Sequence, residues 1–369
     1  SGQSNIIEIK VRFSKGSSTT SSYGYLEFKE STQVKGEYFL RTSTGNSYIP
    51  PGTPLIYHFE ITDSKGDMLI TEPQVFTYKD TRFNWEEITE GPITVLFHGP
   101  IETRARLIAK AMLQTLDNMG PLLGADTTKP IRVNLYNNSI EMSKALPPRS
   151  EAIRTELVTE GMAFPDIGML LVLGSGTRAK GTASHELTHI LVHRATKDSF
   201  LPIPAWLNEG LAEYGNIDPG ISYDLALEFA IATNKLQPIL YLDTPPSTPE
   251  DVIIFYGQGR SIVQLLVTKF GREKIKEFMS EFNTGKSIDT SLESIYGFDR
   301  QGLDRQWRDW IGAAPSNAPI KSPSKPTTHL PVPTLRPYSL TPYPSSSPEQ
   351  ISNPSATLEI DTIVNSSKE

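Results

Sequence analysis

Cysteine is absent from the 369-residue chain, which excludes disulfides, thiolate metal sites and a cysteine nucleophile together. A basic excess is absent as well, because 42 acidic residues outnumber 35 lysines and arginines and leave a net charge of −7. This balance argues against nucleic acid or an anionic membrane as the main partner. No apolar run approaches the ~18–20 residues of a transmembrane helix. The longest, IGMLLVL at 167–173, has the length of a strand.

Residues 1–90 have the pattern of β-structure. NIIEIKVRFS alternates apolar and polar residues, and PLIYHFEITDSKGDMLITEPQVFTY has the form of a hairpin around a Ser-Lys-Gly turn. No helical period interrupts them. These features predict an antiparallel, immunoglobulin-like β-sandwich that serves as an accessory domain.

In residues 91–312 the β-type alternation gives way to short apolar strands followed by helical patterns, which predicts an α+β domain. PITVLFHG, IRVNLY and GMLLVL are short apolar strands. Between the first two, residues 101–120 repeat apolar side chains at helical spacing, and this helix is expected to end at Gly120-Pro121. From residue 181 onward helical patterns dominate, so the strands come first and the helices follow.

The segment 313–369 is rich in proline, serine and threonine. Eleven of the 29 prolines lie between Pro315 and Pro354. Such a composition buries too little apolar surface to offset the entropy of ordering, so this tail is predicted to be disordered. A cell-wall or surface partner is expected to engage it.

Three of the six histidines fall within nine residues, in GTASHELTHILVHRAT at 181–196. His185 and His189 are four apart, so on a helix both imidazoles face the same ion. Imidazoles suit Zn²⁺, and a bound zinc with an open position lowers the pKa of its water to about 7. Glu186, directly beside His185, is then placed to accept the proton of that water as general base. The alternative is a surface helix whose histidines have this spacing by chance.

A third ligand decides between these readings. PAWLNEGLAEYG at 204–215 begins behind a proline, ends at a glycine, and carries Glu209 and Glu213 one turn apart. Two imidazoles and the Glu209 carboxylate leave the fourth zinc position to water, as in catalytic sites. Glu213 on the same face is predicted to accept a hydrogen bond from the free N–H of a ligating histidine.

The combination H-E-L-T-H followed by W-L-N-E-G-L-A-E-Y resembles the gluzincin metallopeptidases, which include thermolysin and aminopeptidase N, and above all the bacterial peptidase MA-like domain. The resemblance covers about residues 91–312. It implies that His185, His189 and Glu209 hold the zinc and that Glu186 is the catalytic base. Aminopeptidase-like members use a tyrosine in a Y-x-x-G setting to bind the oxyanion, and FYGQGRSIVQLL at 255–266 nominates Tyr256, expected at the start of a helix.

Other histidines fit less well. His193 is eight residues from His185, too far along a helix axis for one ion, and is expected to contact the helix-end carbonyls. His58 and His98 lie in β-like segments and are expected to be structural. His329, the one further histidine after Glu209, lies in the proline-rich tail.

These features predict a zinc-dependent metallopeptidase that acts on peptides or proteins. The G-x-M-E-N segment of aminopeptidases is missing. TEGMAFPDIG at 159–168 occupies the place of the edge strand that pairs with substrate. Glu160 there is a candidate for binding the amino terminus of a substrate, but the residues around it do not follow the order of the aminopeptidase segment. Endopeptidase activity is therefore favoured over aminopeptidase activity.

Two alternatives stay open at this point. One is a catalytically inactive zincin-fold protein that binds or adheres at the cell surface; the other is a β-rich adhesion protein whose helical half is scaffolding. The chain is expected to be monomeric and secreted or attached to the cell surface. Because it begins with SGQSN and not with methionine, any targeting segment is expected to lie outside it.

Overall fold

The structure is a computed structural model, and it describes residues 4–16, 18, 20–42, 48–147, 157–176, 178–197, 199, 201–316, 334–337 and 356–360. The chain forms two compact units. The first consists mainly of the residues up to Asn84, and the second begins at Trp85. The mixed α+β class expected from the sequence is confirmed, with sheets in the N-terminal part and helices in the C-terminal half of the second unit.

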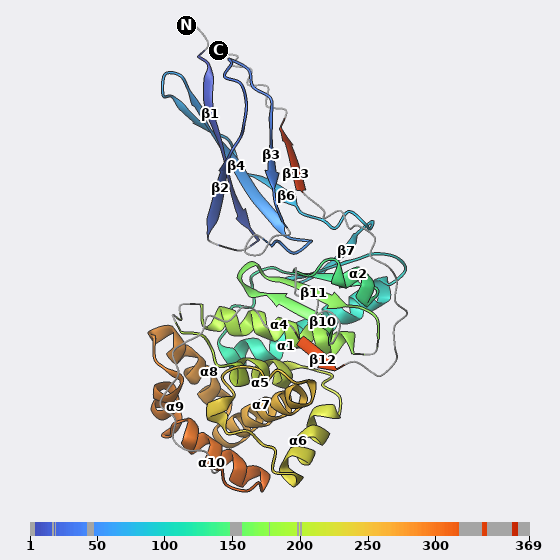
Figure 1. The fold of residues 1–369 in the computed structure, drawn as a ribbon, viewed down its shortest axis with the longest axis vertical. Coiled ribbons are helices and arrows are strands. Elements are labelled where there is room, and N and C mark those ends of the chain that lie inside the picture. Colours follow the sequence, from blue (N-terminus) through green and yellow to red (C-terminus); the bar gives the residue numbers. More distant parts are fainter. Residues whose placement is uncertain are drawn as a thin grey trace. The chain divides into compact units, whose positions relative to one another are not determined.

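The first unit is built from antiparallel strands (Figure 1). Its main sheet has the order β2-β1-β4-β5, with β6 also paired to β4, while β3 pairs with β13. The alternation in the sequence buries one face of β1 and β4, where Val11, Phe59 and Ile61 pack together. The strands are β1 (Ile6–Lys15), β2 (Ser21–Tyr25), β3 (Gly36–Leu40), β4 (Pro54–Asp63), β5 (Met68–Ile70), β6 (Gln74–Thr77) and β13 (Ala356–Ile360).

The second unit contains a six-stranded sheet of order β12-β10-β11-β9-β8-β7. Strands β8, β9 and β11 are parallel, and β7 and β10 are antiparallel to their neighbours. The parallel strands are almost wholly apolar because both of their faces are covered. The strands are β7 (Glu86–Glu90), β8 (Ile93–Phe97), β9 (Ile131–Tyr136), β10 (Leu157–Phe164), β11 (Met169–Leu173) and β12 (Thr334–Pro337).

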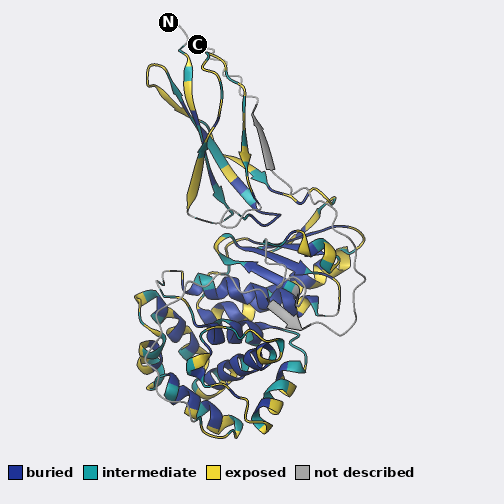
Figure 2. Cartoon of the chain, in the orientation of Figure 1, coloured by how far each residue is buried: buried dark blue, intermediate teal, exposed yellow. Residues whose placement is uncertain are grey.

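Helices cover this sheet and continue away from it. Helices α1 and α4 pack against the sheet, α5 packs on α4, and α7 packs on α5 (Figure 1). Figure 2 shows α4 and α5 as largely buried. The helices are α1 (Glu102–Leu123), α2 (Ser139–Ser143), α4 (Ala179–Ala195), α5 (Ala205–Gly215), α6 (Ser222–Ala232), α7 (Pro249–Phe270), α8 (Arg272–Glu281), α9 (Ile288–Tyr296) and α10 (Arg300–Ile311).

Helices α5 and α7 touch through their backbones. A Cβ added to Gly210 of α5 would collide with the carbonyl oxygen of Gly259, and one added to Gly259 of α7 would lie 2.8 Å from the carbonyl oxygen of Trp206. Two facing glycines let the helix axes approach more closely than side chains would allow. The contact lies one residue from Glu209 and three from Tyr256, so it sets the spacing between these two side chains.

Three details differ from the sequence-based expectation. Helix α1 does not end at Gly120-Pro121 but continues to Leu123, because a proline in the last turn removes only one late hydrogen bond and Gly124 closes the end with φ 69°. Strand β7, within the segment assigned to the accessory domain, pairs with β8 of the second unit. The segment expected to form a sheet edge, β10, has β12 on its outer side.

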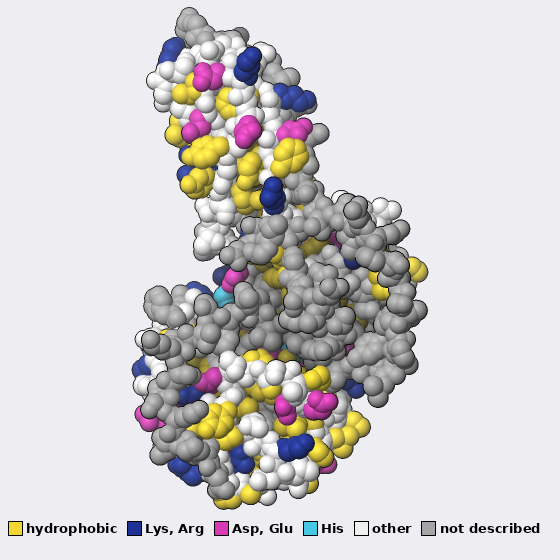
Figure 3. Space-filling view, in the orientation of Figure 1, with side chains coloured by type: hydrophobic (Ala, Val, Ile, Leu, Met, Phe, Trp, Pro, Cys, Tyr) yellow, Lys and Arg dark blue, Asp and Glu magenta, His cyan; other side chains and the backbone are white. Residues whose placement is uncertain are grey.

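Apart from residues 313–316 and the short strands β12 and β13, the predicted disordered tail lies outside the described residues, so its disorder stays a prediction. In the described ranges, no helix combines the length and apolar character that membrane crossing requires. On the face drawn in Figure 3, the described acidic, basic and hydrophobic side chains are intermixed.

We expect Gly210→Ala to lower the free energy of unfolding by about 2 kcal/mol. Overpacking costs about 1–3 kcal/mol, and the upper end applies because a backbone carbonyl cannot rotate away, while alanine recovers about 1 kcal/mol of helix propensity. Chemical denaturation measures the difference. Gln264→Ala, on the exposed side of α7, is the matched control and should change stability by less than about 0.5 kcal/mol. Wild-type stability of Gly210→Ala would show that the close approach is not required.

Candidate metal centre

Helix α4 carries two imidazoles that face one another. His185 and His189 are one turn apart, their Nε2 atoms are 3.1 Å apart, and their rings meet edge to face with centroids 4.8 Å apart. Both side chains are buried, although the sequence of α4 contains several polar residues. Buried polar groups are stable only with partners, so the neighbours of these imidazoles define the site.

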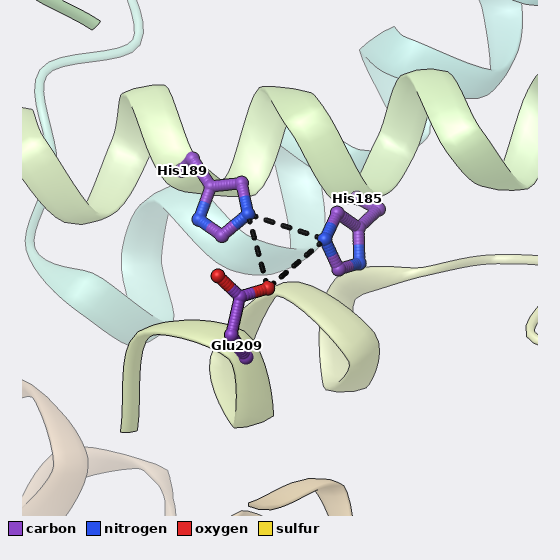
Figure 4. Close-up of side chains that lie close together, drawn as sticks. All are labelled: His185, His189 and Glu209. Carbon is purple, nitrogen blue, oxygen red and sulfur yellow. Dashed lines mark hydrogen bonds and ion pairs between the residues drawn. The ribbon is translucent and has the colours of Figure 1, made fainter. Parts of the chain in front are cut away.

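Helix α5 supplies the third group. Glu209 Oε2 lies 3.4 Å from His185 Nε2 and 3.5 Å from His189 Nε2. Figure 4 shows the two histidines on one helix and the glutamate on the next converging on a common point. Within the described residues, His185, His189 and Glu209 form the group of histidine and carboxylate side chains able to hold a metal ion.

The spacing of these three atoms fits zinc. Bonds of about 2.0–2.1 Å in a tetrahedral arrangement place ligand atoms about 3.3–3.4 Å apart. The separations of 3.1, 3.4 and 3.5 Å lie close to that value. Two nitrogens and one carboxylate oxygen are also a ligand set that zinc accepts, so the residues present fit the ion.

A second layer of acceptors holds the imidazoles. His185 Nδ1 is 3.0 Å from Glu213 Oε1, and His189 Nδ1 is 3.1 Å from Asn208 Oδ1. Acceptor oxygens at these distances favour an N–H at Nδ1 of each ring, and that tautomer leaves each Nε2 lone pair facing the common point. The contact of Glu213 agrees with the prediction from the sequence. Asn208 was not predicted, although it stands directly before Glu209 in the W-L-N-E-G segment.

The surrounding charges favour a cation. Burial lowers the pKa of His185, but the carboxylates of Glu213 and Glu209 outweigh it and raise that pKa to about 10. Burial raises the pKa of Glu209, but His189 and His185 outweigh it and lower that pKa to about 2. The carboxylates around the two imidazoles therefore create a negative electrostatic field that favours a positive charge at this point, and this is the electrostatic condition for a metal site.

Glu186 lies beside the metal group and against strand β10. Its side chain is fully buried. A Cβ added to Gly161 of β10 would lie 2.6 Å from Glu186 Cγ and 2.7 Å from its Oε1. Strand β10 therefore passes directly over this carboxylate, and only a residue without a side chain fits there.

Tyr256 of α7 lies close to the metal group. Its ring centroid is 6.1 Å from that of His185, and it stacks on Tyr223 of α6 at 5.7 Å. Burial raises the pKa of Tyr256 well above 10, so the phenol is a neutral hydrogen-bond donor.

The position of Tyr256 within its helix differs from the prediction. Helix α7 does not start at Tyr256 but at Pro249, where Thr248 caps it by accepting a hydrogen bond from the N–H of Asp251. The Y-x-x-G setting of Tyr256 predicted a helix start at this residue. In the structure a Cβ added to Gly257 would lie 2.7 Å from the carbonyl oxygen of Tyr223, so this glycine serves a tertiary contact.

The other described histidines lie outside the metal group. His193 does not contact helix-end carbonyls through its ring; its Nε2 lies 3.2 Å from Asp166 Oδ1. His98 Nε2 lies 3.2 Å from Glu141 Oε2, and His58 Nε2 lies 4.0 Å from Glu60 Oε1. His329 is outside the described residues.

Comparison with known families gives the class of the chain. The Peptidase MA superfamily matches residues 111–313, which is more than half of the sequence. The chain belongs to this superfamily. The expected gluzincin zinc metallopeptidase domain is thereby confirmed, and the buried His-His-Glu group suits a zinc cofactor. No curated protein matches the chain significantly.

Solved structures of an M1 zinc metallopeptidase from Deinococcus radiodurans show a distant likeness. One is 14% identical and covers 82% of this chain and 77% of its own, with a TM-score of 0.36. A mutant form is 16% identical, and the match covers 64% of this chain and 53% of the mutant's own, with a TM-score of 0.33. The same mutant bound to a Tyr-Ser-Ala substrate is also 16% identical. That match covers 65% of this chain and 53% of the mutant's own, with a TM-score of 0.34. The chain thus spans about half the length of the mutant-form chains, and TM-scores this low add nothing to the family assignment.

We expect the purified protein to bind about one Zn²⁺ per chain, because three donor atoms already meet at zinc spacing. Elemental analysis after zinc loading and dialysis measures the stoichiometry. His185→Ala and His189→Ala should lose the metal, while His193→Ala, on the same helix but paired with Asp166, should retain it. A wild-type protein without zinc after reconstitution would contradict the metal centre.

Proposed function

We propose that this chain hydrolyses peptide bonds with a zinc-activated water and Glu186 as general base. The observation that carries the proposal is the meeting of His185, His189 and Glu209 at zinc spacing, with Glu186 buried directly beside them. When bound, zinc supplies a Lewis acid that polarises the carbonyl and lowers the pKa of a water. His185, His189 and Glu209 are the groups that would hold it.

The protein side chains carry the protons. Glu186 accepts a proton from the water as the water oxygen bonds to the carbonyl carbon. The same carboxyl then gives this proton to the amide nitrogen as the carbon–nitrogen bond breaks, so the amine leaves neutral and Glu186 is restored. The buried position of Glu186 excludes competing water from this transfer.

Tyr256 is proposed to stabilise the negative oxygen that forms on the attacked carbonyl. A neutral phenol donates a hydrogen bond without changing its charge, and burial holds Tyr256 in that form. Its stacking on Tyr223 and the close contact of Gly257 with the Tyr223 carbonyl limit the freedom of the ring. Tyr256 thus has the preorganisation that this role requires.

The substrate is proposed to be an extended peptide that takes the place of β12 along β10. Support comes from the antiparallel pairing of β12 with β10, which is the pairing an extended peptide would make, and from the passage of β10 over Glu186 at Gly161. A cavity of about 170 Å³ adjoins this place and is lined in part by Glu160, Arg178 and Thr182. The opposite charges of Glu160 and Arg178 suit a polar residue of the substrate. Endopeptidase activity is favoured because the aminopeptidase G-x-M-E-N segment is missing.

The finer features of the chain belong to the same proposal. The antiparallel first unit is proposed to be an immunoglobulin-like accessory domain, and the enzyme a monomer that is exported or held at the cell surface. The β-rich unit and the proline-rich tail support this location. Cell fractionation with an antibody to the chain tests it, and a purely cytoplasmic signal would refute it. A catalytically inactive binding protein is not favoured, because binding alone needs no buried carboxylate at Glu186.

We expect Glu186→Gln to reduce the rate of hydrolysis by at least ~10²-fold while zinc is retained, because the amide cannot accept the proton. Digestion of a peptide library, read by mass spectrometry with and without chelator, provides the assay and also shows whether cleavage is internal. Glu228→Gln, on the exposed side of α6, is the matched control. Near-normal turnover of Glu186→Gln would remove Glu186 from the role of base.

We expect Tyr256→Phe to bind zinc normally and to lower kcat on the order of 10²–10³-fold, because the loss of one hydrogen-bond donor to the oxyanion has an effect of this size. The substitution keeps the ring and its stacking on Tyr223. Tyr241→Phe, at a half-exposed tyrosine, should leave kcat unchanged. If Tyr256→Phe retains the wild-type kcat on a cleaved peptide, another group binds the oxyanion.

A further inference from the structure

Asn216, the first residue after helix α5, has both ends of its amide held. Its Nδ2 donates to Glu213 Oε2 at 3.0 Å, and its Oδ1 accepts from the backbone N–H of Asp218 at 2.9 Å. The side chain is only 6% exposed. An amide fixed at both ends and shielded from water has one orientation, so its N–H is always directed at Glu213.

Glu213 connects this amide to the metal centre. Its Oε2 accepts from Asn216, and its Oε1 lies 3.0 Å from Nδ1 of His185. The hydrogen bond from Asn216 at one oxygen and the contact with His185 at the other limit the rotation of this carboxylate about its terminal bond. A continuous chain of contacts therefore runs from the Asp218 N–H through Asn216 and Glu213 to a zinc-ligand candidate.

Helix α4 itself closes this chain of contacts. A Cβ added to Gly181 would lie 2.6 Å from Asn216 Oδ1 and 2.7 Å from the carbonyl oxygen of Asp218. Gly181 is one helical turn before His185. The helix that carries His185 thus also forms the wall against which Asn216 is packed, and only glycine leaves room for it.

We infer that Asn216 is a positioning residue for the metal centre: it fixes Glu213, and through Glu213 the ring orientation and tautomer of His185. The inference rests on the proposed zinc site. Without the amide, Glu213 Oε2 would be buried without this donor, and the carboxylate would be free to turn away from His185. Outer partners of metal-bound histidines typically contribute 10–100-fold to metal affinity.

The alternative is that Asn216 only ends helix α5. In that case its loss lowers stability and leaves the imidazole of His185 and the affinity for zinc unchanged. Asn134 allows a direct comparison, because it is another buried asparagine of the second unit and lies on β9, outside the metal group. Removal of either amide costs stability, but only Asn216 is linked to His185.

The experiment measures the zinc dissociation constant of the full chain by competition with a chromophoric chelator. Asn216→Leu has nearly the same shape without donor or acceptor, and we expect it to weaken zinc binding about tenfold or more. Asn134→Leu should lower the melting temperature and leave the zinc affinity within about twofold of wild type. Asn216→Ala is the second variant if Asn216→Leu does not fold.

Two further readouts separate positioning from stability. In the zinc-loaded protein the Nδ1–H proton of His185 should give a slowly exchanging NMR signal, which Asn216→Leu broadens or shifts and Asn134→Leu leaves in place. Gly181→Ala should weaken zinc binding severalfold as well, because the added methyl group displaces Asn216 without changing its chemistry.

Wild-type zinc affinity and an unchanged His185 signal in folded Asn216→Leu or Asn216→Ala would overturn the inference. This failure is distinguishable from failure of the proposed function. If only the inference is wrong, the wild-type protein still binds zinc and cleaves peptides; if the proposed function is wrong, the wild-type protein does not cleave peptides, whether or not it binds zinc.

Discussion

The approach of helix backbones without intervening side chains is the constraint on which the site depends. Helix α4 provides two ligand candidates, α5 the third and α7 the tyrosine. The distances between these helices therefore set every separation in the centre except the one between the two imidazoles. The facing pair Gly210 and Gly259 brings α5 and α7 together, and Gly181 admits the end of α5 against α4. A methyl group at any of these positions would overlap neighbouring atoms and force the packed segments to shift.

The chemistry-bearing residues were largely predictable because their spacing follows helix geometry. His185 and His189 are four apart, as are Glu209 and Glu213, and one turn of helix puts each pair on one face. The convergence of the two pairs depends on tertiary structure, which helix spacing alone does not predict. It was predicted from the resemblance to a known family. The α+β order of strands and helices was predictable from hydrophobic periodicity in the same local way.

What the sequence left unpredicted depends on contacts between distant segments. Asn208 stands beside a predicted ligand, but nothing in the pattern says that its amide faces His189. Asn216 lies past the end of the helix, where periodicity carries no information. Gly257 resembles a helix break because its propensity is low, and its contact with the Tyr223 carbonyl appears only in the folded chain. Pro121 likewise looks like a helix end, although the last turn of α1 accommodates it.

Gly161 on β10 has a consequence for how this enzyme can change. A side chain at this position would occupy the space of Glu186, so substitutions along β10 are constrained at Gly161. The same holds for Gly181, Gly210 and Gly259 in the helices. These residues carry no functional group, yet we expect a survey of tolerated substitutions to find them as restricted as the candidate metal ligands. Substitutions that keep the fold are expected more readily in the lining of the neighbouring cavity than at these glycines.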